Sequence, residues 1–173
     1  MPFFLVDFDK THPFIVIDVG GGSTELSVFS STNLVASKSF DIGTIRILDK
    51  KVKPENWTNA KEWLKKITAN HPNLTAIGTG GNINKIYRLA NLKEGESLST
   101  KKFNQVSKQL QALTLEQRIV ELGLKPDRAD VIVPACEIYA NLFKWGNVKE
   151  TIVPSVGLVD GIIQLLIEKN LGN

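Results

Sequence analysis

The chain has 173 residues, 42% of them hydrophobic, and a formal net charge of +3. A chain of this size can form one domain, since about 68–70% of the unfolded surface is buried at roughly 150 residues. Its single cysteine excludes an internal disulfide and a zinc site built from several cysteines. The lysines are scattered along the sequence, so we expect a mixed-charge surface and no nucleic-acid partner.

The sequence also lacks the patterns of a membrane or exported protein. No apolar run approaches the roughly 18 residues that a membrane span requires. The N-terminus has no basic region followed by an apolar core and a small-residue cleavage site. We therefore expect a cytoplasmic protein with no membrane partner.

The first half of the chain alternates apolar and polar residues in short runs. This pattern predicts strands over residues 3–8, 14–19, 25–30 and 34–40. Pro54 begins a predicted helix that ends before Pro72. A short buried strand over residues 74–77 and a helix from Asn82 to about residue 91 follow.

The second half of the chain is mostly helical in pattern. Two helices are predicted between residues 99 and 123, and the second begins with a capping box at residues 114–117. Asp127 or Asp130 is predicted to cap a longer helix that reaches Trp145. A last strand over residues 148–153 and a closing helix from Gly157 complete a single domain over residues 1–173.

The most informative segment joins two predicted strands and reads Asp18-Val-Gly20-Gly21-Gly22-Ser23-Thr24-Glu25. Three glycines let the backbone adopt positive φ and let an anion approach main-chain N–H groups. The two hydroxyls add donors, and the two carboxylates are the hard oxygen ligands that Mg²⁺ prefers. The segment predicts a phosphate and metal loop, with an ordinary glycine-rich β-turn as the alternative.

Two better-known glycine-rich loops do not fit this segment. A Walker A loop needs a lysine before its Ser or Thr and a helix after it, whereas Gly22 precedes Ser23 and a strand follows. The dinucleotide-binding fingerprint fails because Glu25 stands where its last glycine should be.

Residues 18–26 resemble the signature of the exopolyphosphatase/guanosine-pentaphosphate phosphatase (Ppx/GppA) family, which belongs to the actin, sugar kinase and Hsp70 superfold. Three later segments fit the same family in order: residues 39–48 resemble its Gly-x-x-Arg-Leu segment, 78–82 its second glycine-rich loop, and 128–134 its Arg-Ala-Asp helix start. The resemblance implies a ribonuclease H-like α/β fold, with a mixed β-sheet flanked by helices.

The resemblance also implies which half of the phosphatase core this chain represents. It corresponds to the second, C-terminal half, and the first half, with the glutamate that positions the attacking water, has no counterpart in the sequence. The missing half is therefore an expected partner, and a homodimer stays open.

The resemblance assigns roles to the residues of the loop. Asp18 and Glu25 would bind Mg²⁺ and act in catalysis. The backbone of Gly20, Gly21, Gly22 and Ser23 would hold the terminal phosphate, with help from the hydroxyls of Ser23 and Thr24.

Three further places carry predicted contacts. Gly80 and Gly81 follow a strand and begin a helix, so their N–H groups could face an anion, with a tight strand–helix turn as the alternative. Arg46 suits phosphate, with a surface arginine on a short helix as the alternative. At residues 155–161 Val159 replaces the family's arginine, which leaves a charge contact there open; Asp160 could keep an acidic role, with helix capping or a solvated surface position as the alternative.

The expected function is a phosphohydrolase that releases terminal phosphate from inorganic polyphosphate or guanosine pentaphosphate with Mg²⁺. The isolated chain is expected to be inactive because it lacks the catalytic glutamate. The alternatives are a nucleotide-binding module of the actin or kinase type and a noncatalytic phosphate-sensing or assembly domain.

Overall fold

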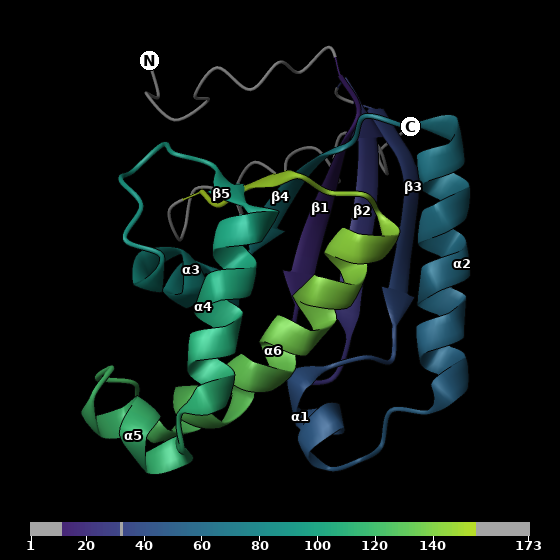
Figure 1. Ribbon diagram of the computed structural model, residues 1–173. Coiled ribbons are helices and arrows are strands. Elements are labelled where there is room, and N and C mark those ends of the chain that lie inside the picture. Colours follow the sequence, from purple (N-terminus) through teal and green to yellow (C-terminus); the bar gives the residue numbers. More distant parts are fainter. Residues whose placement is uncertain (1–11, 32, 155–173) are drawn as a thin grey trace.

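The computed structural model describes residues 12–31 and 33–154. Within them, a six-stranded sheet has the order β3-β2-β1-β4-β6-β5. Its strands are β1 (Phe14–Val19), β2 (Thr24–Ser30), β3 (Asn33–Phe40), β4 (Thr75–Thr79), β5 (Leu98–Ser99) and β6 (Glu150–Ile152). β1 pairs antiparallel with β2 and parallel with β4, so the C-terminal ends of β1 and β4 lie side by side (Figure 1).

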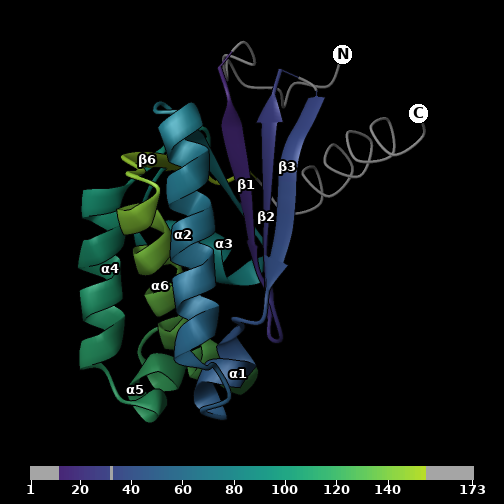
Figure 2. The same cartoon turned by 90° about the vertical axis from the view of Figure 1, so that its right-hand side faces the viewer.

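Six helices accompany the sheet in the described part of the chain. They are α1 (Thr44–Leu48), α2 (Pro54–Asn70), α3 (Gly81–Leu89), α4 (Thr100–Ala112), α5 (Leu115–Val120) and α6 (Pro126–Trp145). Figure 2 shows α2, α4 and α6 on one side of strands β1, β2 and β3. Both views place α1 and α5 at the end of the molecule where β1 ends. None of these helices is both long and apolar enough to cross a membrane.

The side chains of β1 alternate between the two faces of the sheet, as strand geometry requires. Ile15 and Ile17 are buried in the main core, which they share with α6. The opposite face carries a smaller cluster, in which the rings of Phe14 and Phe29 stack with centroids 5.1 Å apart. Asp18 belongs by alternation to this second face, where it is exposed at the end of the strand.

The structure confirms the α/β class and most of the predicted elements. Strands β1, β2 and β3 and the helix that begins at Pro54 lie where the sequence pattern predicts them. The capping box is present, because Thr114 and Gln117 each accept a hydrogen bond from the other's backbone N–H. The predicted strand over residues 3–8, the closing helix from Gly157 and the segment around Val159 lie outside the described residues.

The structure differs from the sequence prediction at the start of α6. This helix begins at Pro126 with Lys125 as its N-cap, so the prediction that Asp127 or Asp130 caps it is wrong. Proline suits the first helical position because its missing N–H would have had no partner there. The structure also shows α1, the short helix that the sequence analysis named as the alternative at Arg46, and adds β5, which it did not predict.

Arg118 joins three helices through its guanidinium group. Nε donates to the carbonyl of Leu110 at 3.0 Å, and Nη2 donates to that of Leu113 at 2.9 Å, where α4 ends. Nη1 donates to the carbonyl of Ala129 at 3.0 Å, in the first turns of α6. The last carbonyls of a helix have no partner within it. Arg118, on α5, therefore closes α4 and fixes the start of α6 against it.

We predict that Arg118→Met lowers the free energy of unfolding by about 2–4 kcal/mol, because partly buried carbonyls lose a charged donor. The matched control is Arg88→Met, since Arg88 is exposed in the last turn of α3 and its side chain donates to no described residue. Urea denaturation measures both variants. Equal losses in the two would show that the three hydrogen bonds contribute nothing.

Candidate functional site

Two carboxylates face each other across the first hairpin. Asp18 on β1 and Glu25 on β2 are directly opposite in the strand register, and both are exposed. Residues paired in this way point to the same face, with Cβ atoms about 4.5–5.5 Å apart. Like charges at this position destabilise a sheet. The pair is therefore a candidate cation site, as the sequence predicts.

The Glu25 carboxylate is held by two hydroxyl groups. Ser23 Oγ donates to its Oε1 at 2.6 Å, and Ser39 Oγ on β3 donates to the same oxygen at 3.0 Å. The Ser23 proton is thus used within the protein, so this geometry gives no support to its predicted donation to a phosphate. Thr24 is buried and donates to the carbonyl of Ile42 at 2.6 Å, so its predicted phosphate-binding role also lacks support.

The carbonyl groups of the glycine loop accept hydrogen bonds from the first residues of α1. Thr44 N–H donates to the carbonyl of Gly20 at 3.0 Å, and Ile45 N–H donates to that of Gly21 at 3.0 Å. Arg46 Nε donates to the carbonyl of Gly22 at 2.6 Å. Arg46 therefore stabilises the backbone of the loop, and its role as a phosphate ligand stays a prediction.

These carbonyl contacts determine where the N–H groups of the loop point. In a planar trans peptide the C=O of one residue and the N–H of the next point in opposite directions. The N–H groups of Gly21, Gly22 and Ser23 are therefore directed away from α1. None of the three donates to a described residue, so the loop offers three adjacent donors to a ligand.

The glycines of the loop matter for the room that their missing side chains leave, and not for positive φ. Positive φ, expected from the sequence, is absent at Gly20, Gly21 and Gly22. A Cβ at Gly21 would lie 2.9 Å from the side chain of Ile45, whereas a Cβ at Gly22 would meet nothing within 4 Å. The space beside Gly22 is thus open to a ligand that approaches the backbone.

The second glycine-rich segment lies beside Asp18. Gly80, the N-cap of α3, has a φ of +94°, which side-chain-bearing residues rarely adopt. A Cβ at this position would also lie 3.2 Å from Oδ1 of Asp18. The side-chain amide of Asn84 donates to the Gly80 carbonyl at 2.8 Å. This glycine is therefore required both by the turn and by the neighbouring carboxylate.

Arg128 is a site residue to which the sequence analysis gave no role. It is exposed on the first turn of α6, and a Cβ at Gly81 would lie 3.0 Å from its Nη1. Its guanidinium thus lies over the start of α3, and among the described residues it has no acidic partner. The only sequence signal was the resemblance of residues 128–134 to a family segment, which carries no contact information.

Tyr139 ties the two strand ends together beneath this site. Its hydroxyl lies 3.2 Å from the carbonyl of Thr79 and 3.4 Å from that of Ile17, so it donates between β4 and β1. Burial raises the pKa of Tyr139 well above its ordinary value, and the Asp18 carboxylate acts in the same direction. The hydroxyl therefore remains a donor at any physiological pH.

The carboxylates at the strand ends are of the type and number that a magnesium ion takes as ligands. Within the described residues no group of three or more His, Cys, Asp or Glu side chains could hold a metal ion. Magnesium does not need one, because it takes one or two carboxylates and completes its shell with water and phosphate oxygens. Asp18 and Glu25 supply two carboxylates next to backbone N–H groups that donate to no described residue, which is the combination that a magnesium phosphate would need.

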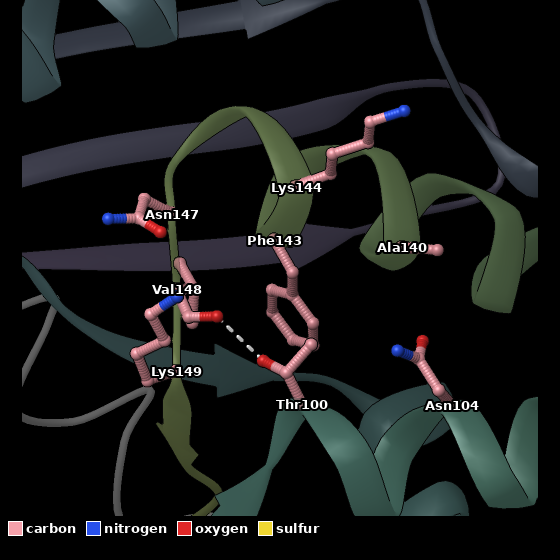
Figure 3. A pocket seen from close by; sticks show the side chains of 8 residues that line it. All are labelled: Thr100, Asn104, Ala140, Phe143, Lys144, Asn147, Val148 and Lys149. Carbon is pink, nitrogen blue, oxygen red and sulfur yellow. Dashed lines mark hydrogen bonds between the residues drawn. The ribbon is translucent and has the colours of Figure 1, made fainter.

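A cavity of about 400 Å³ lies at the other end of α6 (Figure 3). It is lined by Thr100, Asn104, Ala140, Phe143, Lys144, Asn147, Val148 and Lys149. From Arg128 to this end of the helix the distance is roughly 24 Å at 1.5 Å per residue. The cavity contains none of the predicted site residues, so it is separate from the site at the strand ends.

Comparison with known proteins identifies sequences related to this chain. The sequence matches the Ppx/GppA phosphatase family over residues 6–170. A Haemophilus influenzae protein named "Putative exopolyphosphatase" is 26% identical over 171 residues, which cover 90% of this chain and 52% of that protein. The chain thus spans about half the length of this relative.

Solved structures agree with this match. An exopolyphosphatase from Cytophaga hutchinsonii has a TM-score of 0.73 at 22% identity, covering 95% of this chain and 59% of that one. The Ppx/GppA phosphatase of Aquifex aeolicus has a TM-score of 0.71 at 21% identity, covering 91% and 57%. These likenesses show the fold: the ribonuclease H-like α/β fold of the actin superfold, with a mixed sheet flanked by helices.

The sequence match covers almost the whole chain, so it establishes the family. The protein belongs to the Ppx/GppA phosphatase family. Membership supports a phosphatase-type function, and the paired carboxylates and the glycine loop lie in segments that fall within the match.

We predict that Gly43→Ala lowers the free energy of unfolding by about 1–3 kcal/mol, as overpacking does. A Cβ at Gly43 would lie 2.2 Å from the Gly21 carbonyl oxygen, so α1 or the loop must move. Gly22→Ala is the control, because its Cβ meets nothing within 4 Å. Urea denaturation compares the two, and a Gly43 variant as stable as the Gly22 variant would contradict the close packing of α1 on the loop.

Proposed function

We propose that this chain is the phosphate- and metal-binding part of a phosphohydrolase that removes terminal phosphate from a linear phosphate chain. The substrate would be inorganic polyphosphate or guanosine pentaphosphate, and the proposed location is the cytoplasm. One observation carries the proposal: two opposed carboxylates, and three N–H groups and a guanidinium without partners among the described residues, lie where β1 and β4 end.

Each group has a distinct task in this proposal. The N–H groups of Gly21, Gly22 and Ser23 bind phosphate oxygens, and the open space at Gly22 allows their close approach. Arg128 offsets the negative charge from the side of α3, where the first N–H groups of the helix also point. Asp18 and Glu25 would hold Mg²⁺, which when bound neutralises phosphate oxygens and orients the chain for in-line attack.

In this proposal, binding of the phosphate chain and its hydrolysis depend on different halves of the phosphatase core. The glutamate that positions the attacking water belongs, by resemblance, to a half of the phosphatase core that this sequence does not contain. We therefore expect the 173-residue chain to bind a magnesium phosphate chain and to hydrolyse it negligibly, because positioning supplies much of the rate in phosphoryl transfer.

We predict that Arg128→Gln weakens binding of magnesium tripolyphosphate about tenfold, because it removes a charged donor from the phosphate site. Arg88→Gln is the control, since Arg88 lies at the far end of α3. Isothermal titration calorimetry at fixed Mg²⁺ and salt measures both. Parent-like binding by Arg128→Gln would remove Arg128 from the site.

We predict that a longer form of the protein containing the first half hydrolyses polyphosphate, and that Asp18→Asn and Glu25→Gln each lower its turnover at least about 100-fold. The isolated chain should release phosphate far more slowly than about 1 s⁻¹, a low rate for an enzyme. Phosphate release is followed colorimetrically. ATP binding without any turnover in the longer form would instead favour a noncatalytic nucleotide-binding module.

A further inference from the structure

A row of polar side chains crosses the sheet at the level of the candidate cation site. Ser39 on β3 pairs in register with Glu25 on β2, which pairs with Asp18 on β1. Residues in register project to the same face, so these three side chains are neighbours. Ser39 is thus part of the site, although the sequence analysis gave it no role.

The hydrogen bonds of this row restrict one carboxylate. Ser39 Oγ and Ser23 Oγ donate to the same atom, Oε1 of Glu25, at 3.0 and 2.6 Å. Oε2 accepts no hydrogen bond from any residue in the described part of the chain. One oxygen is therefore held by the protein while the other is left for a ligand. Because Glu25 is exposed, its side chain would otherwise sample several rotamers.

We propose that Ser39 is a positioning residue of the divalent-cation site: it holds the Glu25 carboxylate in the orientation in which it binds a cation together with Asp18. This inference rests on the proposed function, which assigns Mg²⁺ to these two carboxylates. Ser39 acts only through Glu25. Fixing a ligand before the cation arrives reduces the side-chain entropy that binding would otherwise cost.

Ser39 suits this task better than Ser23. Ser23 belongs to the loop whose N–H groups bind phosphate in the proposed function, so its hydroxyl is the one whose position a bound ligand would affect. Ser39 lies on β3, where its backbone is paired with Glu25 itself. The hydroxyl of Ser39 therefore keeps its place relative to Glu25 whether or not the loop is occupied.

The same strand supplies a matched control. Ser37 lies two residues away on the same face, and its Oγ is 3.0 Å from that of Ser27, its register partner on β2. Ser37→Ala thus removes one hydroxyl contact of the same length from the same pair of strands. It touches neither carboxylate.

The test measures cation binding by the 173-residue chain directly, with Mn²⁺ as the probe because it takes the same oxygen ligands as Mg²⁺. Free Mn²⁺ is quantified by electron paramagnetic resonance. We expect Ser39→Ala to raise the Kd for Mn²⁺ about tenfold, at the lower end for residues that orient a metal ligand, since Ser23 remains. Ser37→Ala should bind as the parent does. Ser39→Thr should also bind as the parent, because it keeps the hydroxyl and suits a strand.

A second measurement separates positioning from structure. Without a cation, Ser39→Ala and Ser37→Ala should lose similar amounts of stability to urea, since each loses one exposed hydroxyl contact. Parent-like Mn²⁺ binding by Ser39→Ala, or equal weakening in both alanine variants, would overturn the inference. Asp18→Asn and Glu25→Gln complete the set: if neither weakens Mn²⁺ binding, the proposed metal site fails, whereas weakening in these two but not in Ser39→Ala refutes only the role of Ser39.

Discussion

The register of β1 between its two neighbours is the constraint on which the site depends. It places Asp18 opposite Glu25 on one side and opposite Thr79, just before the second glycine turn, on the other. A slip by one residue would turn every side chain of β1 to the other face. Such a slip would expose Ile17 and bury Asp18, so burial of the main core fixes the carboxylates as firmly as it fixes the strands.

The packing of α1 provides the second constraint, because it converts a flexible glycine loop into an oriented one. Each glycine carbonyl of the loop accepts a hydrogen bond from α1, either from its backbone or from the Arg46 side chain. The N–H of the next residue then points in the opposite direction. This packing requires Gly43, whose missing side chain lets the start of α1 approach the loop. The same contact explains why Arg46 lies so close to the glycine loop: it fixes the Gly22 carbonyl, and through it the direction of the next N–H.

Local sequence patterns predicted the strands and the two carboxylates because both follow from alternation along one segment. They could not predict what distant residues do to that segment. The Thr24 hydroxyl is bound by a carbonyl of residue 42, and the Ser23 hydroxyl is bound by a carboxylate, so neither remains the simple donor that composition suggested. Positive φ at the triple glycine was wrong for the same reason, since α1 sets the loop conformation. Arg128 reaches the site only through the packing of α6, which periodicity does not encode.

The charged groups of the folded site have opposite signs on its two sides, and this arrangement favours a ligand that carries both signs. Asp18 and Glu25 face each other across one hairpin, where like charges repel. Arg128 lies over the α3 turn with no acidic partner among the described residues. A metal cation alone would relieve the carboxylates, and an anion alone would satisfy the arginine and the loop N–H groups. A phosphate chain with a divalent cation, the ligand of the proposed function, would do both at once, and each part of it would strengthen the binding of the other.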